Sequence, residues 1–406
     1  MALIVQKFGG SSVKNAERIF NVARIITDTY KEGNDVVVSL SAQGDTTDEL
    51  IEKAKEINEN PSKREMDMLM STGEQASVAL CAMAIEKLGY PVISLNAWQA
   101  GVRTDSNYGS ARIKDLADDR IRAELNRKNI VLVTGFQGVN RFHDITTLGR
   151  GASDLSAVAL AAKLDAEVCR IYTDVEGVFT ADPRIVKDAK KLDEITFDEM
   201  LELASLGAQV LQNRSVELAK RYGVHLEVLS SLADKPGTLV KEIVNKMEST
   251  AISGVAKDEN VASIALTQLE DVPGVAHKIF SLLAKSRINV DIILQSIGRD
   301  NTKDITFTVK KDSCAQAKQI LLDNKEALNF TELTINDKLS KISIVGSGMI
   351  NNPGIASLLF EALYNVGINI HMISTSEIKV SVLIDLVDSD RAVQAVHEKF
   401  FSKNAF

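Results

Sequence analysis

The chain has 406 residues, which is enough for two or three domains. Its 55 acidic and 47 basic residues give a net charge of −8, and no basic cluster favours nucleic-acid binding. The N-terminal segment lacks a signal-peptide pattern and no apolar run approaches the roughly 18 residues of a membrane span, so we expect no membrane association. Three widely spaced cysteines, Cys81, Cys169 and Cys314, predict buried reduced thiols in a cytoplasmic protein, with no disulfides and no metal site.

The first motif is VQKFGGSS, residues 5–12, at the point where an apolar strand-like run leads into a helix-like segment. Two glycines allow the backbone to approach a ligand closely, and serines at a helix start leave N–H groups that attract anions. Lys7 could meet the same anion. The stretch therefore fits a phosphate site as well as it fits an ordinary strand-to-helix turn, but it is not a Walker-type loop.

Short apolar runs alternate with helical patterns over the first 245 or so residues. The runs at 35–42, 90–97, 129–136 and 168–175 are typical of strands buried on both faces, and residues 71–89 and 153–166 have helical patterns. This alternation predicts an α/β fold with a mostly parallel sheet covered by helices. Ligands of such sheets bind beyond the carboxyl ends of the strands, where this chain has glycine-rich and polar stretches.

Glu74, in the stretch MSTGEQ, is expected just inside a helix. An acid at a helix N-terminus is stabilising and needs no function, which is the favoured interpretation from this stretch alone. As the only acid of that loop, it could also hold an ammonium group.

Two later loops carry further candidates. In GRGASD, small residues flank Arg150, whose guanidinium can bind a carboxylate or phosphate in a forked geometry, and Asp154 opens the next helix. Asp154 could be only a capping residue, but its nearness to Arg150 favours a function. In TDVEGVFTADPR, Asp174 and Asp182 could orient a nucleotide or hydrated Mg²⁺, or could simply bond backbone amides.

The C-terminal part contains an internal repeat. Residues 270–293 align without a gap with residues 350–373, and Pro-Gly, phenylalanine and Ile-Asn recur at the same offset of 80. Each copy has the pattern of a βαββ unit with room for a second helix, which predicts two small α+β modules. They are either a duplicated structural module or a paired sensor with a ligand between the copies.

Taken together, the motifs resemble those of the aspartate kinases in the amino acid kinase family. KFGGSS, SAQGDTTDEL, GRGASD, YTDVEGVFTADPR, LGAQVLQNRSVE, the Pro-Gly repeat and ISTSEIKVSVLID occur in the order expected of that family. The resemblance implies an amino acid kinase domain over 1–245, a first βαββαβ ACT domain over 263–335, and a second built from 250–262 and 338–406. Strand 251–258 would then pair into the second ACT domain and make the first an insertion.

The activity implied is transfer of the γ-phosphoryl group of MgATP to the β-carboxylate of L-aspartate, the first step of lysine, threonine and methionine biosynthesis. An aspartate carboxylate is ionised at pH 7 and needs no general base, so positioning and charge stabilisation would carry the reaction. The resemblance assigns catalysis to Lys7, Asp154 and Arg150, and aspartate binding to Thr47, Glu74, Arg150 and Ser153. It assigns nucleotide binding to Lys7, Gly9, Gly10, Ser11, Thr173, Asp174, Phe179, Asp182, Arg184 and Gln209. No side chain is assigned as a ligand of a resident metal.

The resemblance also implies feedback inhibition by lysine or threonine, or both, at the ACT domains, and a homodimer or larger assembly formed through them. The effector candidates are Asp271, Gly274, Val275, Ala276, Asn289, Gln295, Asn369, Ser374 and Thr375.

Four positions depart from the family pattern. Gln209 stands where many members have a lysine that would neutralise phosphates, although Arg214 or Mg²⁺ could compensate. Ala152, Gln43 and Tyr108 replace the usual glycine, methionine and histidine.

Two alternatives are left open: a kinase acting on glutamate or N-acetylglutamate, which the ACT repeats disfavour, and a catalytically weak regulatory subunit, which Gln209 and Ala152 motivate. A dehydrogenase is excluded because no GxGxxG follows the first strand.

Overall fold

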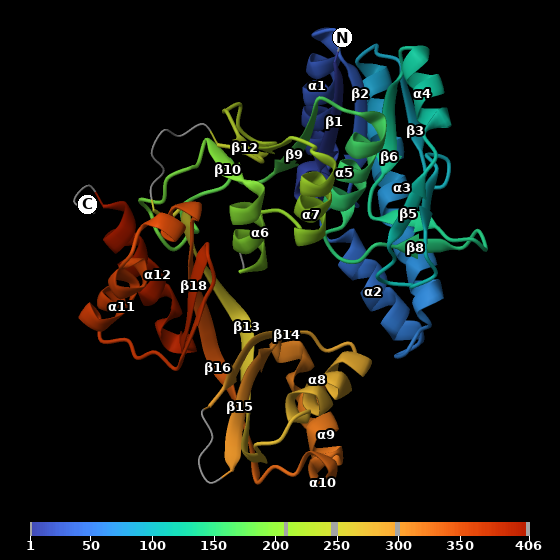
Figure 1. The fold of residues 1–406 in the computed structure, drawn as a ribbon. Coiled ribbons are helices and arrows are strands. Elements are labelled where there is room, and N and C mark those ends of the chain that lie inside the picture. Colours follow the sequence, from blue (N-terminus) through green and yellow to red (C-terminus); the bar gives the residue numbers. More distant parts are fainter. Residues whose placement is uncertain (1, 207–209, 245–250, 297–300, 403–406) are drawn as a thin grey trace. The chain divides into compact units, whose positions relative to one another are not determined.

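The computed structural model describes residues 2–206, 210–244, 251–296 and 301–402. The chain divides into two compact units (Figure 1). The first contains residues 1–179, 190–205 and 209–247, and the second contains residues 180–189, 206–208 and 248–406.

The first unit is built on an eight-stranded sheet. Its order is β10 (Glu194–Thr196), β12 (Thr238–Lys241), β11 (Leu226–Ser230), β9 (Val168–Thr173), β1 (Leu3–Phe8), β2 (Asp35–Leu40), β6 (Ile130–Thr134) and β3 (Val92–Leu95). All neighbours are parallel except β11 and β12. The four apolar runs predicted as buried strands are β2, β3, β6 and β9, so the prediction of a mostly parallel sheet is confirmed.

Helices cover both faces of this sheet. The helices of the unit are α1 (Ala16–Lys31), α2 (Thr46–Ile57), α3 (Lys63–Lys87), α4 (Asp119–Asn126), α5 (Ser153–Leu164), α6 (Phe197–Ser205) and α7 (Asn213–Tyr222). Phe8 at the end of β1 is buried in the core formed with α1 and α3. Because side chains alternate along a strand, Lys7 points to the opposite face, where α5 packs against β1, β2 and β9.

A second, four-stranded sheet in this unit has the order β5 (Ile113–Leu116), β4 (Val102–Thr104), β7 (Gln137–Val139) and β8 (Ile145–Thr147). Strand β8 leads directly into the Gly149–Gly151 loop and then into α5. This small sheet therefore determines where the loop that carries Arg150 begins.

Two predicted helix starts were wrong. Helix α3 begins at Lys63, because the Ser62 hydroxyl accepts a hydrogen bond from Glu65 N (3.4 Å) and caps the helix, so Glu74 lies mid-helix and not at its N-terminus. The serines of KFGGSS form a short 3₁₀ helix, η1 (Gly10–Val13), and α1 starts only at Ala16, capped by the Asn15 side chain.

Helix α3 is long and apolar enough to cross a membrane by length and composition alone. It nevertheless packs against α1 and β3 and contains the buried acids Asp67 and Glu74. These are features of a core helix.

The second unit has a six-stranded antiparallel sheet. Its order is β14 (Val290–Gln295), β15 (Thr302–Val309), β13 (Gly254–Glu270), β16 (Glu332–Val345), β18 (Lys379–Asp385) and β17 (Met372–Thr375). Its helices are α8 (Val275–Lys285), α9 (Lys311–Asp323), α10 (Lys325–Leu328), α11 (Ile355–Asn365) and α12 (Ser389–Phe401), with 3₁₀ turns η2 (Ser347–Asn351) and η3 (Leu386–Asp388). This is the predicted α+β architecture.

The two repeats share the long strands β13 and β16. Val255, in the first half of β13, and Ile252, just before the strand, belong to the core of the second repeat. Ile264 and Leu266, in the second half of β13, belong to the core of the first repeat. Helices α8 and α11 start 80 residues apart, after Gly274 and Gly354, which both have φ of 96°. Glycine is needed at both positions because other residues rarely adopt this conformation, which explains why Pro-Gly recurs in the repeat.

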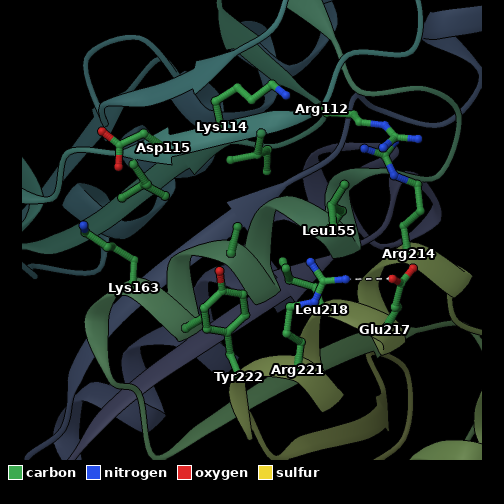
Figure 2. Close-up of a pocket in the computed structure, with 14 residues that line it drawn as sticks. Arg112, Lys114, Asp115, Leu155, Lys163, Arg214, Glu217, Leu218, Arg221 and Tyr222 are labelled. Atoms are coloured by element: carbon green, nitrogen blue, oxygen red, sulfur yellow. Dashed lines mark hydrogen bonds and ion pairs between the residues drawn. The ribbon is translucent and has the colours of Figure 1, made fainter.

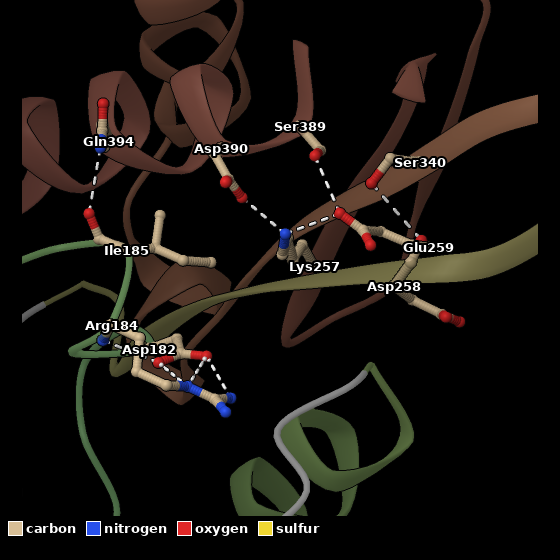
Figure 3. Close-up of polar contacts among 10 residues, drawn as sticks. All are labelled: Asp182, Arg184, Ile185, Lys257, Asp258, Glu259, Ser340, Ser389, Asp390 and Gln394. Atoms are coloured by element: carbon tan, nitrogen blue, oxygen red, sulfur yellow. Dashed lines mark hydrogen bonds and ion pairs between the residues drawn. The ribbon is translucent and has the colours of Figure 1, made fainter. Parts of the chain in front are cut away.

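Residues 180–189 also belong to the second unit, although they lie between segments of the first in the sequence. Val255 N donates to Thr180 O (2.8 Å), Thr180 Oγ1 bonds His397 Nε2 (2.9 Å), and Gln394 Nε2 donates to Ile185 O (3.0 Å). Figure 3 shows this segment beside α12 and the start of β13. The chain following the TDVEGVF loop is thus anchored in the second repeat.

Candidate active site

The carboxyl ends of β1, β2, β9 and β11 meet, as expected for a parallel sheet. Ser12, after β1, shares a hydrogen bond of 2.7 Å between its hydroxyl oxygen and that of Ser231, after β11. The Ser231 hydroxyl also donates to Thr173 O at the end of β9 (3.2 Å). Gly44 N, after β2, donates to Gly10 O (3.0 Å). Four loops that are distant in sequence are thereby joined into one surface.

Lys7 and Asp154 form an ion pair at the centre of this surface. The distance between Lys7 Nζ and Asp154 Oδ1 is 2.7 Å, and the side chains are only 13% and 9% exposed. Asp154 lies in the first turn of α5, and its Oδ2 accepts a long hydrogen bond from Gln212 N (3.4 Å). The carboxylate of Asp154 thus holds the largely buried Lys7 ammonium at a defined position, as part of a pair that is neutral overall.

The KFGGSS loop is packed closely against the loop that follows β2. A Cβ atom added to Gly10 would lie 2.8 Å from Ala42 O, closer than real Cβ atoms come, whereas one on Gly9 would meet only Lys7 Nζ at 3.5 Å. Gly10 is therefore required by a neighbouring backbone, while Gly9 leaves room beside the lysine. Ser11 is exposed next to them.

Arg150 contacts α2. Its side chain is 76% exposed, and its Nη2 atom lies 2.8 Å from Asp48 Oδ1. Thr47, the neighbour of Asp48, is half-buried, and Ser153 is buried at the start of α5. The structure thus brings Arg150 to the α2 start, with a carboxylate already bound to its guanidinium.

Glu74 is buried and points at the loop after β2. Its Oε1 accepts a hydrogen bond from Ala42 N (3.2 Å), while its Oε2 is buried and has no hydrogen-bond partner among the described residues. Burial raises the pKa of the Glu74 carboxyl to about 7, and the backbone hydrogen bonds only partly oppose this. Gly73 allows this approach, because a Cβ atom there would lie 2.8 Å from the Ala42 Cβ.

The predicted nucleotide residues do not all belong to the first unit. Thr173 and Asp174 lie at the end of β9, where Thr173 Oγ1 donates to Asp174 Oδ1 (3.0 Å), and Phe179 pairs with Lys191 in an isolated bridge. Asp182 and Arg184 belong to the second unit, where the Arg184 guanidinium binds both oxygens of Asp182 and lowers the pKa of that carboxyl (Figure 3). Gln209 lies outside the described residues.

The described departures from the family pattern have structural roles. The Ala152 methyl is buried in an apolar cluster with Phe136 and Leu148, and its φ of −79° does not require glycine. Gln43 Nε2 donates to Val13 O (2.8 Å), and the Tyr108 hydroxyl donates to Asp144 Oδ2 (2.8 Å). Ala152, which motivated the weak-catalyst alternative, therefore has a packing role in this cluster.

Arg214, which the sequence suggested as a cation that could compensate for Gln209, does not direct its charge to the Lys7 region. Its guanidinium donates to Leu148 O (2.6 Å) and to Ala111 O (3.0 Å). Sequence reasoning also missed Gln212, whose Nε2 donates to Arg150 O (3.2 Å), and Asp48, which pairs with the Arg150 guanidinium. Like Arg214, both residues lie within the quoted motifs, but their partners are distant in sequence.

The effector candidates fall into two separate sets in one chain. Asp271, Gly274, Val275 and Ala276 surround the start of α8, with Asn289 and Gln295 at the two ends of β14, whereas Asn369, Ser374 and Thr375 lie before and on β17. Strands β14 and β17 form opposite edges of the sheet. A ligand held between both sets of one chain is therefore incompatible with this sheet order.

No group of three or more His, Cys, Asp or Glu side chains in the described part of the chain could hold a metal ion. All three cysteines are buried and free, as predicted.

Comparisons with known proteins agree with this architecture. Residues 2–230 match the model of the amino acid kinase family, and residues 264–324 and 342–400 match an ACT domain model. The chain is 50% identical over 400 residues to an aspartokinase of Bacillus sp. strain MGA3, covering 98% of this chain and 97% of the relative. A structure of E. coli aspartokinase III with aspartate and ADP superposes with a TM-score of 0.84 at 26% identity, covering 98% of this chain and 100% of that one. The same enzyme with lysine and aspartate gives a TM-score of 0.76 at 25% identity, with the same coverage.

Proposed function

The chain belongs to the aspartate kinases of the amino acid kinase family, and on this premise we propose that it transfers the γ-phosphoryl group of MgATP to the β-carboxylate of L-aspartate. The product is 4-phospho-L-aspartate, and the reaction begins the synthesis of lysine, threonine and methionine in the cytoplasm. The observation that carries the proposal is the largely buried Lys7–Asp154 ion pair beside the close-packed glycine loop.

Lys7 is the residue that would meet the transferring phosphates. The ion pair with Asp154 fixes the position of the Lys7 ammonium group, so the side chain need not reorient when phosphates bind. Gly10 and Ser11 would supply backbone donors next to it, whereas Gly9, whose amide already donates to Tyr172 O (3.4 Å), would leave room for the phosphates beside the lysine. The donor set fits a nucleotide whose phosphates already carry Mg²⁺, because it offers a cation and a carboxylate and not a cluster of metal ligands. Bound with the nucleotide, Mg²⁺ would neutralise part of the phosphate charge.

Aspartate would be held by the two charged groups on its α-carbon, the ammonium by α3 and the α-carboxylate by the Arg150 loop. The unpaired, buried Glu74 Oε2 fits an ammonium group, which can donate the missing hydrogen bond. Arg150 would exchange Asp48 for the α-carboxylate of the substrate, with Thr47 and Ser153 beside it. The β-carboxylate is then free to attack, and because it is already ionised at pH 7, the site needs only to bring it in line with the phosphate.

The nucleotide would lie along Thr173, Asp174 and Phe179, with Asp182, Arg184 and Gln209 as further candidates. The E. coli relative solved with aspartate and ADP supports a nucleotide site of this kind.

Regulation would come from the ACT domains, with the effector candidates named above as ligands. The E. coli relative solved with lysine supports lysine as one effector, and threonine is the second candidate. The edge strands β14 and β17 expose Ile293, Leu294 and Ile373. Pairing of these edges between two chains would cover that apolar surface and bring effector residues of two copies together, which supports the proposed dimer.

Trapping of the acyl phosphate tests the proposal. The purified chain, MgATP, L-aspartate and hydroxylamine should give aspartyl hydroxamate, and glutamate in place of aspartate should give none. Loss of the product on adding lysine or threonine would identify the effector. Folded protein that binds lysine or threonine but forms no hydroxamate would contradict the kinase activity and favour the alternative, a catalytically weak sensing subunit.

Gln209 allows a direct test of that alternative. Gln209→Lys should raise kcat by less than about threefold if the existing cations suffice, measured in the coupled ADP-release assay. A gain of about tenfold or more, which corresponds to about 1.4 kcal/mol, would instead support the weak-catalyst interpretation.

The two loop glycines provide a matched pair of variants. Gly10→Ala should lower kcat/KM for ATP at least tenfold, because its methyl group would collide with Ala42 O and push the loop away. Gly9→Ala has space for its methyl and should change kcat/KM for ATP by less than about threefold. Equal effects of the two variants would contradict the role given to this backbone contact.

A further inference from the structure

Two charged side chains from different helices bind the segment that precedes Arg150. Asp67, on α3, is fully buried. Its Oδ2 accepts hydrogen bonds from Thr147 N and Gly109 N (both 2.9 Å), and its Oδ1 accepts one from the Thr147 hydroxyl (2.7 Å).

Arg214, on α7, binds the backbone one residue after Thr147 and two residues after Gly109. Its two terminal nitrogens donate to Leu148 O (2.6 Å) and Ala111 O (3.0 Å). Arg214 also lines a pocket of about 600 Å³, where its guanidinium lies beside that of Arg112 (Figure 2). Burial, and to a smaller extent Arg112, lower the pKa of Arg214.

Asp67 and Arg214 thus bind the same two backbone stretches, one from α3 and the other from α7. Gly109 and Ala111 form one stretch, Thr147 and Leu148 form the other, and Ala111 N donates directly to Thr147 O (2.9 Å). Immediately afterwards come Gly149 (φ 97°), Arg150 and Gly151 (φ 73°). A loop with two such glycines has little conformational preference of its own, so its direction is set by the residues that fix its start.

Neither charge has an ion-pair partner within 4.0 Å among the described residues, so both are used on backbone groups and one hydroxyl. Apolar side chains could not replace them, because the amides of Thr147 and Gly109 and the carbonyls of Leu148 and Ala111 would lose these partners. The two side chains therefore fix the positions of four backbone groups next to the start of the loop.

We propose that Asp67 and Arg214 are positioning residues of the kinase reaction, which fix the start of the 149–151 loop so that Arg150 and the first turn of α5 face the substrate. The inference rests on the proposed function, in which Arg150 binds aspartate.

Kinetics of Asp67→Asn and Arg214→Lys test the inference. Asparagine keeps the volume of Asp67 but one of its two terminal atoms no longer accepts hydrogen bonds, and lysine cannot donate to Leu148 O and Ala111 O with the geometry of a guanidinium. Each variant should raise KM for aspartate at least tenfold, with KM for ATP changed by less than about threefold, at a temperature where both remain folded. Arg221→Lys, on the same helix and paired with the exposed Glu217, is the matched control and should leave both KM values unchanged.

A double-mutant cycle separates positioning from a general loss of structure. In an Arg150→Ala background, Asp67→Asn should change KM for aspartate by less than about threefold, because most of its effect passes through Arg150 and only the remainder through the first turn of α5. If the full effect persists there, or if the single variants lower only the melting temperature, the inference is wrong.

Hydrogen–deuterium exchange gives a readout that does not depend on activity. The Thr147 amide should exchange at least tenfold faster in Asp67→Asn than in the wild-type chain, and unchanged protection of residues 147–153 would overturn the inference even if the chain proved not to phosphorylate aspartate. If the wild-type chain forms no hydroxamate but Asp67→Asn still shows the faster exchange, the proposed function is contradicted and the positioning of the loop is not.

Discussion

Replacement of Lys7 by methionine should lower kcat about a thousandfold while leaving the chain folded. A unit charge about 4 Å from a phosphate, at an effective dielectric constant near 20, contributes about 4 kcal/mol, and each 1.4 kcal/mol corresponds to about a tenfold change in rate. Methionine keeps much of the length of the lysine side chain but carries no charge. Hydroxamate formation at saturating MgATP and aspartate measures the effect, with Lys14→Met as the control, since Lys14 is exposed on the same loop.

The same substitution leaves Asp154 buried without its cation, which costs about 3–5 kcal/mol of unfolding free energy in comparable buried pairs. Lys7→Met combined with Asp154→Asn should therefore recover much of the lost stability in urea unfolding but none of the activity. A Lys7→Met variant that keeps more than a tenth of the wild-type kcat would show that the phosphates are neutralised elsewhere.

The sheet could be predicted because its strands are buried on both faces. Continuous Val and Ile runs such as 35–40 and 130–134 have few alternatives to a central parallel strand. The repeat was equally readable, because Gly274 and Gly354 occupy a conformation that other residues rarely adopt. Both signals are local properties of the chain.

The parts that could not be predicted depend on contacts between distant segments. Asp67 resembles a solvated acid of a helix in the sequence, and only the fold buries it against Thr147, 80 residues away. Asp182 and Arg184 lie within a nucleotide-type motif, yet Thr180–Ala189 packs with the second unit. The sequence predicts Glu74 as a helix-terminal acid because the helical pattern is clear only from Ser71 onward, whereas the residue that caps the start of α3 is Ser62.

Glu74 should make both stability and aspartate affinity depend on pH around neutrality. Its pKa is about 7 in the folded chain, against an ordinary value of 4.5. The folded state therefore binds more protons than the unfolded state between these values, and the free energy of unfolding should fall as the pH rises from about 4.5 to about 7. The loss amounts to about 3 kcal/mol in total. Glu74→Gln should remove this dependence and be the more stable form at pH 8, as measured by urea unfolding without ligand.

Aspartate binding should show the opposite preference of the same carboxyl. Only the ionised Glu74 pairs favourably with an ammonium group, so in the wild-type chain KM for aspartate should rise about tenfold for each pH unit below 7 and level off above it. Glu74→Gln should have a KM for aspartate raised at least a hundredfold at pH 8 and nearly independent of pH from 5.5 to 8, with KM for ATP unchanged. Asp48→Asn is the control, because its exposed carboxylate has to leave Arg150 before aspartate binds, so that this variant should lower KM and keep the pH dependence. A Glu74→Gln variant with nearly wild-type KM for aspartate at pH 8 would mean that the buried, unpaired oxygen of Glu74 does not bind the substrate ammonium. The unfolding free energy lost when Glu74 ionises would then be offset by a contact with some other group.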